Sequence, residues 1–190
     1  RDRPQGGMGM AAGGHTTNTP TDMPNKKEKP EGLRKLLEDC IADMYYAEKR
    51  LVTATKKLAK AAVNEELQQA MLDHHEETKQ HVERLEEVFA LLDKPAKGKK
   101  CDAIDGIVEE ADDIVEEFKD DIALDAAIVA AAQKAEHYEI ASYGSMVAFA
   151  EQLGLKKVGQ LLNSTLEEEK GTDAKLSALA EEVLNAAAEA

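Results

Sequence analysis

The sequence predicts an all-α fold, namely a four-helix bundle made of two helical hairpins. A crossover that contains a short extra helix joins the two hairpins. Alanine, leucine, glutamate and lysine dominate the 190 residues, whereas aromatic residues are 4% and tryptophan is absent. This composition favours long helices over a sheet. Apolar residues recur every three or four positions over four long stretches, as expected for amphipathic helices. Proline, which breaks helices, does not occur after Pro95.

The chain divides into an arm and a helical domain. Residues 1–30 are rich in Gly, Pro, Thr, Asn and Lys and have no apolar period, which predicts a flexible N-terminal arm. The helical period begins at Glu31 and continues to the end, so we expect residues 31–190 to form the bundle. We expect the arm to contact a partner subunit in a homodimer or a higher homo-oligomer.

Two amphipathic stretches form the first predicted hairpin. The inward face of its first helix is Leu37, Ile41, Met44, Glu48, Leu51, Thr55, Leu58 and Ala62. Asn64 can cap a second helix after a very short connection. The inward face of that second helix is Leu67, Met71, His74, Thr78, His81, Leu85, Val88 and Leu92.

The segment KPAKGKK interrupts the pattern, because Pro95 and Gly98 end a helix. We expect residues 94–120 to form the crossover and to contain a small amphipathic helix. The residues of that helix that face inward are Ile104, Ile107, Val108, Ala111, Ile114, Val115 and Phe118.

The third long helix, expected from about Ile122 to Leu153, is apolar on nearly every side, which predicts burial all round by the bundle and by a partner chain. Gly154 is suited to a left-handed C-terminal cap. The fourth helix is expected from about Lys156 to Ala188. Its inward face is Val158, Leu162, Thr165, Glu169, Thr172, Leu176, Leu179 and Val183. A shift of 91 residues aligns EETK with EEEK and Glu48 with Glu139, a faint internal repeat.

Charge and composition exclude several classes of protein. Acidic residues outnumber basic ones 38 to 24, for a net charge of −14, which disfavours binding to nucleic acid or to anionic lipid. No apolar run is long enough to span a membrane, and residues 1–30 lack the apolar segment of a signal peptide. Cys40 and Cys101 form neither a disulfide framework nor a zinc motif, so we expect reduced packing residues in a cytoplasmic protein.

Glutamates recur at equal depth in both hairpins. Glu48 and Glu139 each lie 15 residues before a connection, taken as Val63 and Gly154, and Glu77 and Glu168 each lie 14 residues after one. At a rise of about 1.5 Å per residue, all four are expected about 21 to 23 Å from their turns. Glu136 and His81 are expected at a common depth, one helical turn further from the connections. On the second helix, Glu77 lies between His74 and His81.

Buried carboxylates need counter-charge, because even one unpaired anion costs several kcal/mol to bury. Lysine and arginine are scarce on these faces, so we expect two divalent metal ions, and oxygen-rich ligation suits iron or manganese. Singly, an inward histidine is more often a hydrogen-bonded core residue, and the run EEE at 167–169 is more often surface. We expect His75, His137 and Glu110 on the surface and His15 in the arm. Tyr45 is expected to pack, and Tyr143 could donate to a site carboxylate.

Five segments carry a resemblance to the YciF-type stress proteins of the ferritin-like superfamily. They are MYYAEKRL, HHEETKQHVERL, CDAIDGIVEEA, AAQKAEHYEIASYG and TLEEEKGTDAKL, which lie between residues 44 and 176, and the resemblance extends over roughly residues 33–185. The resemblance implies a bacterial cytoplasmic protein, a ferritin-like four-helix bundle, dimerisation, a diiron centre and a link to stress responses. Its carboxylate motifs fall on Glu48, Glu77, Glu136, Glu139 and Glu168, with His74 beside them.

One departure separates this sequence from the ferritins, which use a Glu-x-x-His pair on two helices. Glu77 is followed by Gln80 and then His81, and Glu168 by Gly171 at the third position. A site this poor in nitrogen favours manganese or exchangeable iron over fast ferroxidase chemistry.

Two functions remain open at this stage. The first is a dinuclear iron or manganese protein that oxidises Fe²⁺ with O₂ or peroxide, as a ferroxidase or a peroxide-consuming protein. Glu77 and Glu168 would then bridge the metals, and the terminal ligands would be Glu48, Glu136, Glu139 and His81, with His74 as the second choice for a nitrogen ligand. The alternative is a helical scaffold with a vestigial site that acts through protein contacts.

Overall fold

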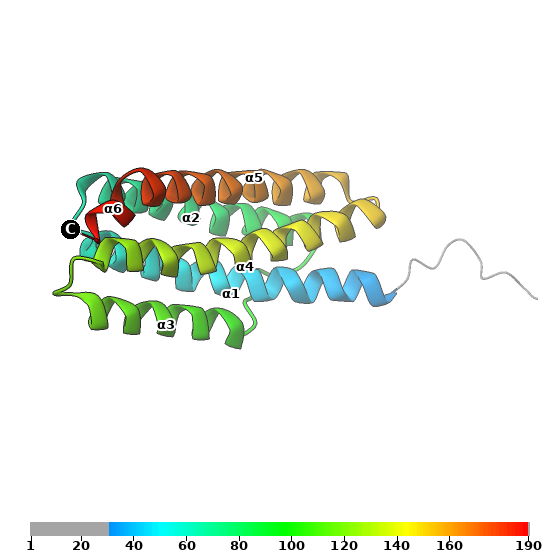
Figure 1. Cartoon of the computed structure of the whole chain (residues 1–190). Helices are drawn as coiled ribbons and strands as arrows, with labels where there is room; N and C mark the ends of the chain where they lie inside the picture. Colours follow the sequence, from blue (N-terminus) through cyan, green and yellow to red (C-terminus); the bar gives the residue numbers. More distant parts are fainter. Residues whose placement is uncertain (1–30, 190) are drawn as a thin grey trace, which may run out of the picture.

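The computed structural model describes residues 31–189, and every regular element in this range is a helix (Figure 1). The four long helices are α1 (Glu31–Ala61), α2 (Glu65–Leu91), α4 (Leu124–Gln152) and α5 (Lys156–Leu179). The crossover contains α3 (Asp102–Phe118), and the π-helical turn η1 (Ala180–Leu184) and α6 (Asn185–Ala187) follow α5. The predicted all-α class is confirmed. The arm, its proposed contact with a partner subunit and His15 lie outside the described residues.

The long helices pack as two hairpins, α1 on α2 and α4 on α5, with α2 against α5 and α1 against α4. The short helix α3 lies along α1 and α4 on the outside of this helical bundle (Figure 1). None of the helices in the described range combines the length and apolar content needed to cross a membrane.

Local interactions fix the two hairpin turns. The Asn64 side chain accepts hydrogen bonds from two of the first backbone N–H groups of α2, so the predicted cap is confirmed. The Asp125 carboxylate accepts hydrogen bonds from the backbone N–H groups of Val63 and Asn64, each at 2.8 Å, and ties this turn to α4. Gly154 has a φ of 70°, the left-handed conformation predicted for the end of α4.

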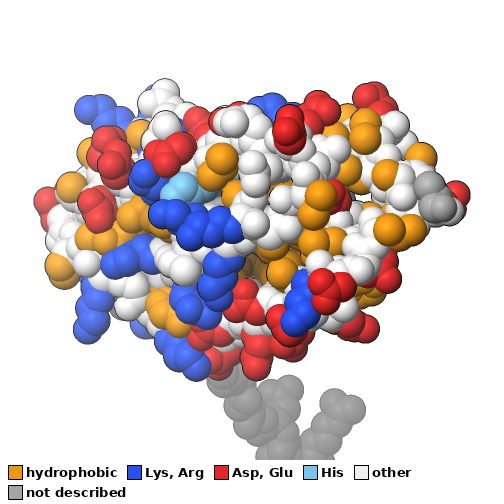
Figure 2. All heavy atoms as spheres, turned by 90° about the vertical axis from the view of Figure 1, so that its left-hand side faces the viewer, with side chains coloured by type: hydrophobic (Ala, Val, Ile, Leu, Met, Phe, Trp, Pro, Cys, Tyr) orange, Lys and Arg blue, Asp and Glu red, His pale blue; other side chains and the backbone are white. Residues whose placement is uncertain are grey.

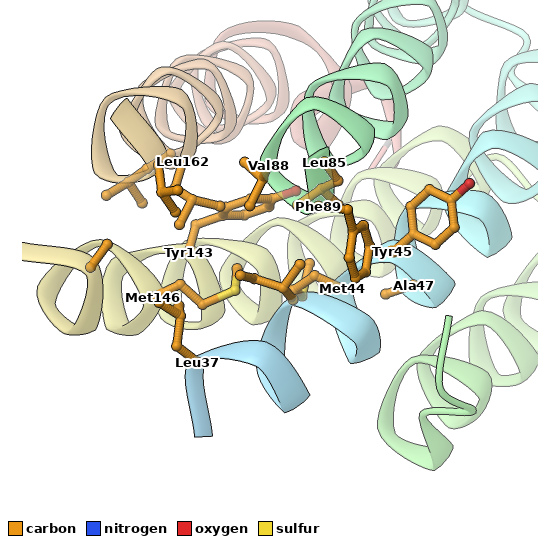
Figure 3. Close-up of a cluster of buried hydrophobic side chains, with 14 of the residues drawn as sticks. Leu37, Met44, Tyr45, Ala47, Leu85, Val88, Phe89, Tyr143, Met146 and Leu162 are labelled. Carbon is orange, nitrogen blue, oxygen red and sulfur yellow. The ribbon is translucent and has the colours of Figure 1, made fainter. Parts of the chain in front are cut away.

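Apolar side chains form two cores, one toward each end of the bundle. Figure 3 shows the first, which includes Leu37, Met44, Leu85, Val88, Tyr143, Met146 and Leu162. There Tyr45 packs edge-on to Phe89, with ring centroids 5.5 Å apart. The second includes Leu58, Leu67, Met71, Ile128, Val129 and Leu176. The predicted inward faces of α1 and α2 are buried at every position, and they supply both cores.

The expectation that α4 is covered on all sides is not met within the single chain. One face of α4 is solvent-exposed, at Ala130, Lys134, His137, Ala141, Ser145 and Ala148. The alanines on this face count as apolar in the sequence pattern, although they are exposed to water. Burial of this face by a partner chain stays a proposal.

The inward face of the last helix shifts by one residue near its end. Val183 was expected to face inward, but it is 40% exposed, whereas Leu184 is 3% exposed and packs in the second core. The cause is η1, because a π-helical turn contains one residue more than the sequence period assumes.

This shift predicts unequal costs for two neighbouring substitutions. Leu184→Ala is expected to lower the free energy of unfolding by about 2–5 kcal/mol, the usual cost of truncating a core leucine. Val183→Ala is expected to change it by about 0.5 kcal/mol or less, as for other surface positions. Urea unfolding of both variants measures the difference, and a larger cost for Val183→Ala would contradict the register seen here.

Candidate metal centre

Four glutamates and two histidines meet inside the bundle, between the two apolar cores. Each is at most 3% exposed, and they come from all four long helices: Glu48 (α1), His74 and His81 (α2), Glu136 and Glu139 (α4), and Glu169 (α5). We call these six residues the acidic cluster. Helical periodicity directs them inward, since each shares a face with the leucines and methionines of its helix.

The ligand atoms of the acidic cluster fall into two groups, and within each group they lie within 4.8 Å of one another. The first group is His74, Glu136, Glu139 and Glu169, and the second is Glu48, His81 and Glu169. His74 Nε2 lies 3.0 Å from Glu136 Oε1, and His81 Nδ1 lies 2.9 Å from Glu169 Oε1. Glu169 is common to both groups.

Most polar atoms of the acidic cluster lack a hydrogen-bond partner among the described residues. They are Glu48 Oε2, His81 Nδ1, Glu136 Oε2 and both carboxylate oxygens of Glu139 and Glu169. His81 Nδ1 is near Glu169 Oε1, but the ring does not direct an N–H at that oxygen. Buried polar atoms are almost always paired, so a set of free oxygens and one ring nitrogen fits bound cations.

Lysine and arginine do not neutralise the acidic cluster; within the described residues its polar partners are the two histidines and one tyrosine hydroxyl. Tyr143 Oη donates a hydrogen bond to Glu48 Oε1 at 2.5 Å, so Tyr143 is a donor to a carboxylate of the site, as the sequence suggested. Within residues 31–189 the ion-pair partners of Glu48, Glu136 and Glu169 are His74 and His81, and no lysine or arginine pairs with them.

Burial makes the acidic cluster hold protons when cations are absent. It raises the pKa of Glu48, raises that of Glu139 well above its usual value, and raises that of Glu169 to about 7. Burial opposes the charged form of His81, but contacts with Glu169 and Glu48 outweigh it and raise the pKa of His81 to about 10. Protons and metal ions would therefore compete for the same atoms.

Two residues expected at the centre, Glu77 and Glu168, lie at its edge. Their side chains are 35% and 37% exposed. Glu168 pairs with Arg84, at 2.6 Å and 3.1 Å, and its Oε2 lies 2.9 Å from His81 Nε2. Glu77 Oε2 accepts a hydrogen bond from the Thr172 hydroxyl at 3.3 Å and lies 3.7 Å from His74 Nδ1. The expectation that these two carboxylates face the middle is wrong.

The reason is that the number of residues from a turn fixes how far along the helix axis a side chain lies, but not the direction in which it points around that axis. Glu168 has the right height, but it is one residue, about 100° of rotation, away from the inward face of α5. Glu169, which the depth comparison missed, lies on that face with Thr165 and Thr172. The periodicity alone contained this signal.

Other residues follow the expectations with one exception. His137 and Glu110 are exposed, and Cys40 and Cys101 are half-buried free thiols. The exception is His75, which was expected on the surface but is 9% exposed, with Nδ1 3.3 Å from Thr55 Oγ1. It lines a surface hollow of about 570 Å³ together with Lys56, Lys57, Lys60 and Lys79. Figure 2 shows lysine and arginine side chains gathered at this end of the bundle.

Comparison with known proteins places the chain in a family. The model of a family described as a domain of unknown function, DUF892, matches residues 32–189. The chain belongs to this family. It is 48% identical over 150 residues to protein YciF of Escherichia coli strain K12, covering 78% of this chain and 90% of YciF. The resemblance to YciF-type proteins is therefore confirmed.

Solved structures support the same relationship. The crystal structure of the E. coli stress protein YciF matches with a TM-score of 0.77 and 45% identity, covering 80% of this chain and 97% of that one. A protein from Rhodopseudomonas palustris described as YcfI, a structural protein, matches with a TM-score of 0.74 and 40% identity, covering 82% and 98%. The fold of this chain is thus shared with both solved structures.

Proposed function

We propose that this protein is a ferritin-like, dinuclear metal-binding protein of the stress response. The observation that carries the proposal is the set of unpartnered carboxylate oxygens in the acidic cluster. Four buried carboxylates would balance two divalent cations, whereas without cations the cluster has to hold protons, on Glu139, Glu169 and His81, to avoid burying four bare anions. Oxygen ligands with one nitrogen for each metal suit iron or manganese. Cytoplasmic location and a homodimer remain part of the proposal.

The assignment of ligands follows the two groups of atoms. Glu169 would bridge, in place of Glu77 and Glu168, because it alone belongs to both groups. His74, Glu136 and Glu139 would complete one position, and Glu48 and His81 the other. With iron bound, the centre would supply one-electron redox chemistry toward O₂ or peroxide and so limit oxidative damage.

Glu168 and Glu77 would orient the two histidines. His81 Nε2 can donate its proton to Glu168 Oε2, which leaves the unpartnered Nδ1 free for a metal. Arg84 holds Glu168 in place for this contact. His74 has the same arrangement in a looser form, with Nδ1 toward Glu77 and Nε2 toward Glu136. Such outer partners fix the tautomer of a metal-binding histidine.

The test of the proposal is metal content. The protein is purified after growth with iron or with manganese, and metal ions are counted per chain; about two are expected. Anomalous diffraction from crystals then locates them, and addition of Fe²⁺ with O₂ or peroxide is expected to give a ferric absorption band. A parent protein with almost no metal under both growth conditions would rule the proposal out.

Glu168→Gln is expected to weaken metal binding about 10- to 100-fold while leaving the number of ions per chain unchanged at saturation. The physical reason is that the amide keeps the contact with His81 but lacks the charge that raises the basicity of the ring. Titration with Mn²⁺ followed by calorimetry measures both quantities. A reduced number of ions at saturation would instead identify Glu168 as a ligand.

The alternative function is a helical scaffold that acts through protein contacts. It is favoured by the structural role ascribed to the R. palustris relative and by exposed large apolar side chains, among them Leu36, Leu72 and Leu91. Metal counts near zero, with a stable oligomer in solution, would support it.

A further inference from the structure

A small apolar cavity lies against the acidic cluster, between α3 and the helices α1, α2 and α4. Its volume is about 20 Å³. Its apolar wall includes Leu58, Met71, Val108, Ala111, Ala131 and Ala135. The polar residues that line it are Thr55, His74 and Glu136, and the last two belong to the first group of the acidic cluster. The cavity therefore adjoins one of the two proposed metal positions.

Alanines from two helices create the space. Ala131 and Ala135 lie on α4 and Ala111 lies on α3, and each is at most 7% exposed. The helix α3 covers this side of the bundle, which makes the crossover part of the cavity wall. A cavity needs roughly 10–15 Å³ to hold one water molecule, so the space is somewhat larger than a water molecule needs.

The cavity offers few polar partners to a water molecule. A buried water needs two to four hydrogen bonds. The Thr55 hydroxyl already donates to Leu51 O at 2.8 Å, and His74 Nε2 lies 3.0 Å from Glu136 Oε1. Glu136 Oε2 is the polar atom of this lining that lacks a partner within the described residues. The lining therefore offers two acceptors, Glu136 Oε2 and the Thr55 hydroxyl oxygen, which is the least that holds a water molecule, whereas a small apolar molecule needs none.

We propose that this cavity binds a small apolar gas molecule, and that its ligand is dioxygen and not peroxide. The choice of oxidant rests on the proposed function, but the binding of an apolar molecule does not. Peroxide has two donors and several lone pairs to satisfy, and this wall offers acceptors for the donors but no donor for the lone pairs, because the Thr55 hydroxyl donates to Leu51 O and His74 Nε2 lies against Glu136. Dioxygen needs no hydrogen-bond partner from the lining, and it would lie beside His74 and Glu136.

Xenon binding tests whether the cavity accepts a small apolar molecule, and this test needs no bound metal. Crystals of the full chain are pressurised with xenon, and one xenon site is expected between α3 and α4. Ala111→Leu, which fills the cavity from α3, is expected to abolish this site. Ala141→Leu, on the exposed face of α4, is the matched control and is expected to keep it. An empty cavity in the parent would overturn the proposal.

Oxidation kinetics test the choice of oxidant. In iron-loaded protein, Ala111→Leu is expected to slow oxidation by O₂ several-fold and to leave oxidation by H₂O₂ unchanged. Equal slowing with both oxidants would overturn the assignment to dioxygen. If Ala111→Leu does not fold, Ala131→Val fills the same space with a smaller change.

The outcomes separate this inference from the proposed function. Xenon binding in a protein that takes up no metal would contradict the dinuclear centre and support the apolar cavity. Two metal ions per chain with no xenon site would support the dinuclear centre and overturn the cavity as a binding site.

Discussion

Replacement of Glu169 by glutamine is expected to reduce metal binding from about two ions per chain to fewer than one, because Glu169 is common to both ligand groups. The amide keeps the size of the side chain but cannot bridge two cations as an anion. The metal-free variant is expected to remain folded but to unfold at a somewhat lower temperature than the metal-free parent, because the amide has lost the ion pair with His81; circular dichroism checks that it is folded before metal is counted. Loss of metal would then not reflect loss of fold.

The run of three glutamates at 167–169 supplies matched controls for this experiment. Glu167 is exposed and pairs with Lys170, so Glu167→Gln is expected to leave both the number of ions and their affinity unchanged. Glu168→Gln is expected to lower the affinity alone. Metal counting on the three variants gives the comparison, and an unchanged count in Glu169→Gln would remove the assigned bridge.

Removal of metal is expected to destabilise the protein, and more so as pH rises. The pKa of Glu169 is raised in the folded state from 4.5 to about 7, so its contribution to stability is present below pH 4.5 and is lost as pH rises through 7. The pKa of His81 is raised from 6.5 to about 10, so its contribution is present below pH 6.5 and is lost as pH rises through 10. Both groups therefore favour the metal-free fold at low pH.

The stabilisation by bound metal has the opposite pH dependence. It increases as pH rises, because metal ions bind the deprotonated ligands. With free metal at 100 times its dissociation constant, one site stabilises the fold by about 2.7 kcal/mol, which is roughly 5–11 °C in Tm. The gap in Tm between protein with Mn²⁺ and protein with a chelator is expected to widen from pH 5 to pH 8. Scanning calorimetry measures it. A gap that narrows over this range would show that the acidic cluster does not bind the metal.

The Glu169→Gln variant provides the control for the pH dependence. With a chelator present, its stability is expected to fall less steeply than that of the parent between pH 5 and pH 8, because the carboxyl that titrates there is gone. The general repulsion expected from a net charge of −14 is almost the same in both proteins. A slope equal to that of the parent would mean that Glu169 does not titrate in this range.

The sequence by itself determined the parts of this protein that depend on local geometry. The three- and four-residue period placed every inward residue of α1 and α2, and Asn64 and Gly154 marked helix ends because their caps are local. The same period brought Glu48, Glu136 and Glu139 inward beside His74 and His81. A helix of known rise and turn carries this information without its neighbours.

Tertiary structure decided which side chains at the edge of each face reach the middle. Glu168 is turned outward and held by Arg84 of α2, whereas Glu169 points between the helices. Leu184 replaces Val183 because one π-helical turn shifts the face, and His75 is buried against Thr55 of α1. The Arg84–Glu168 ion pair and the burial of His75 depend on side chains that neighbouring helices present, which residue spacing along a single helix does not contain, whereas the inward position of Glu169 was already given by the period of α5.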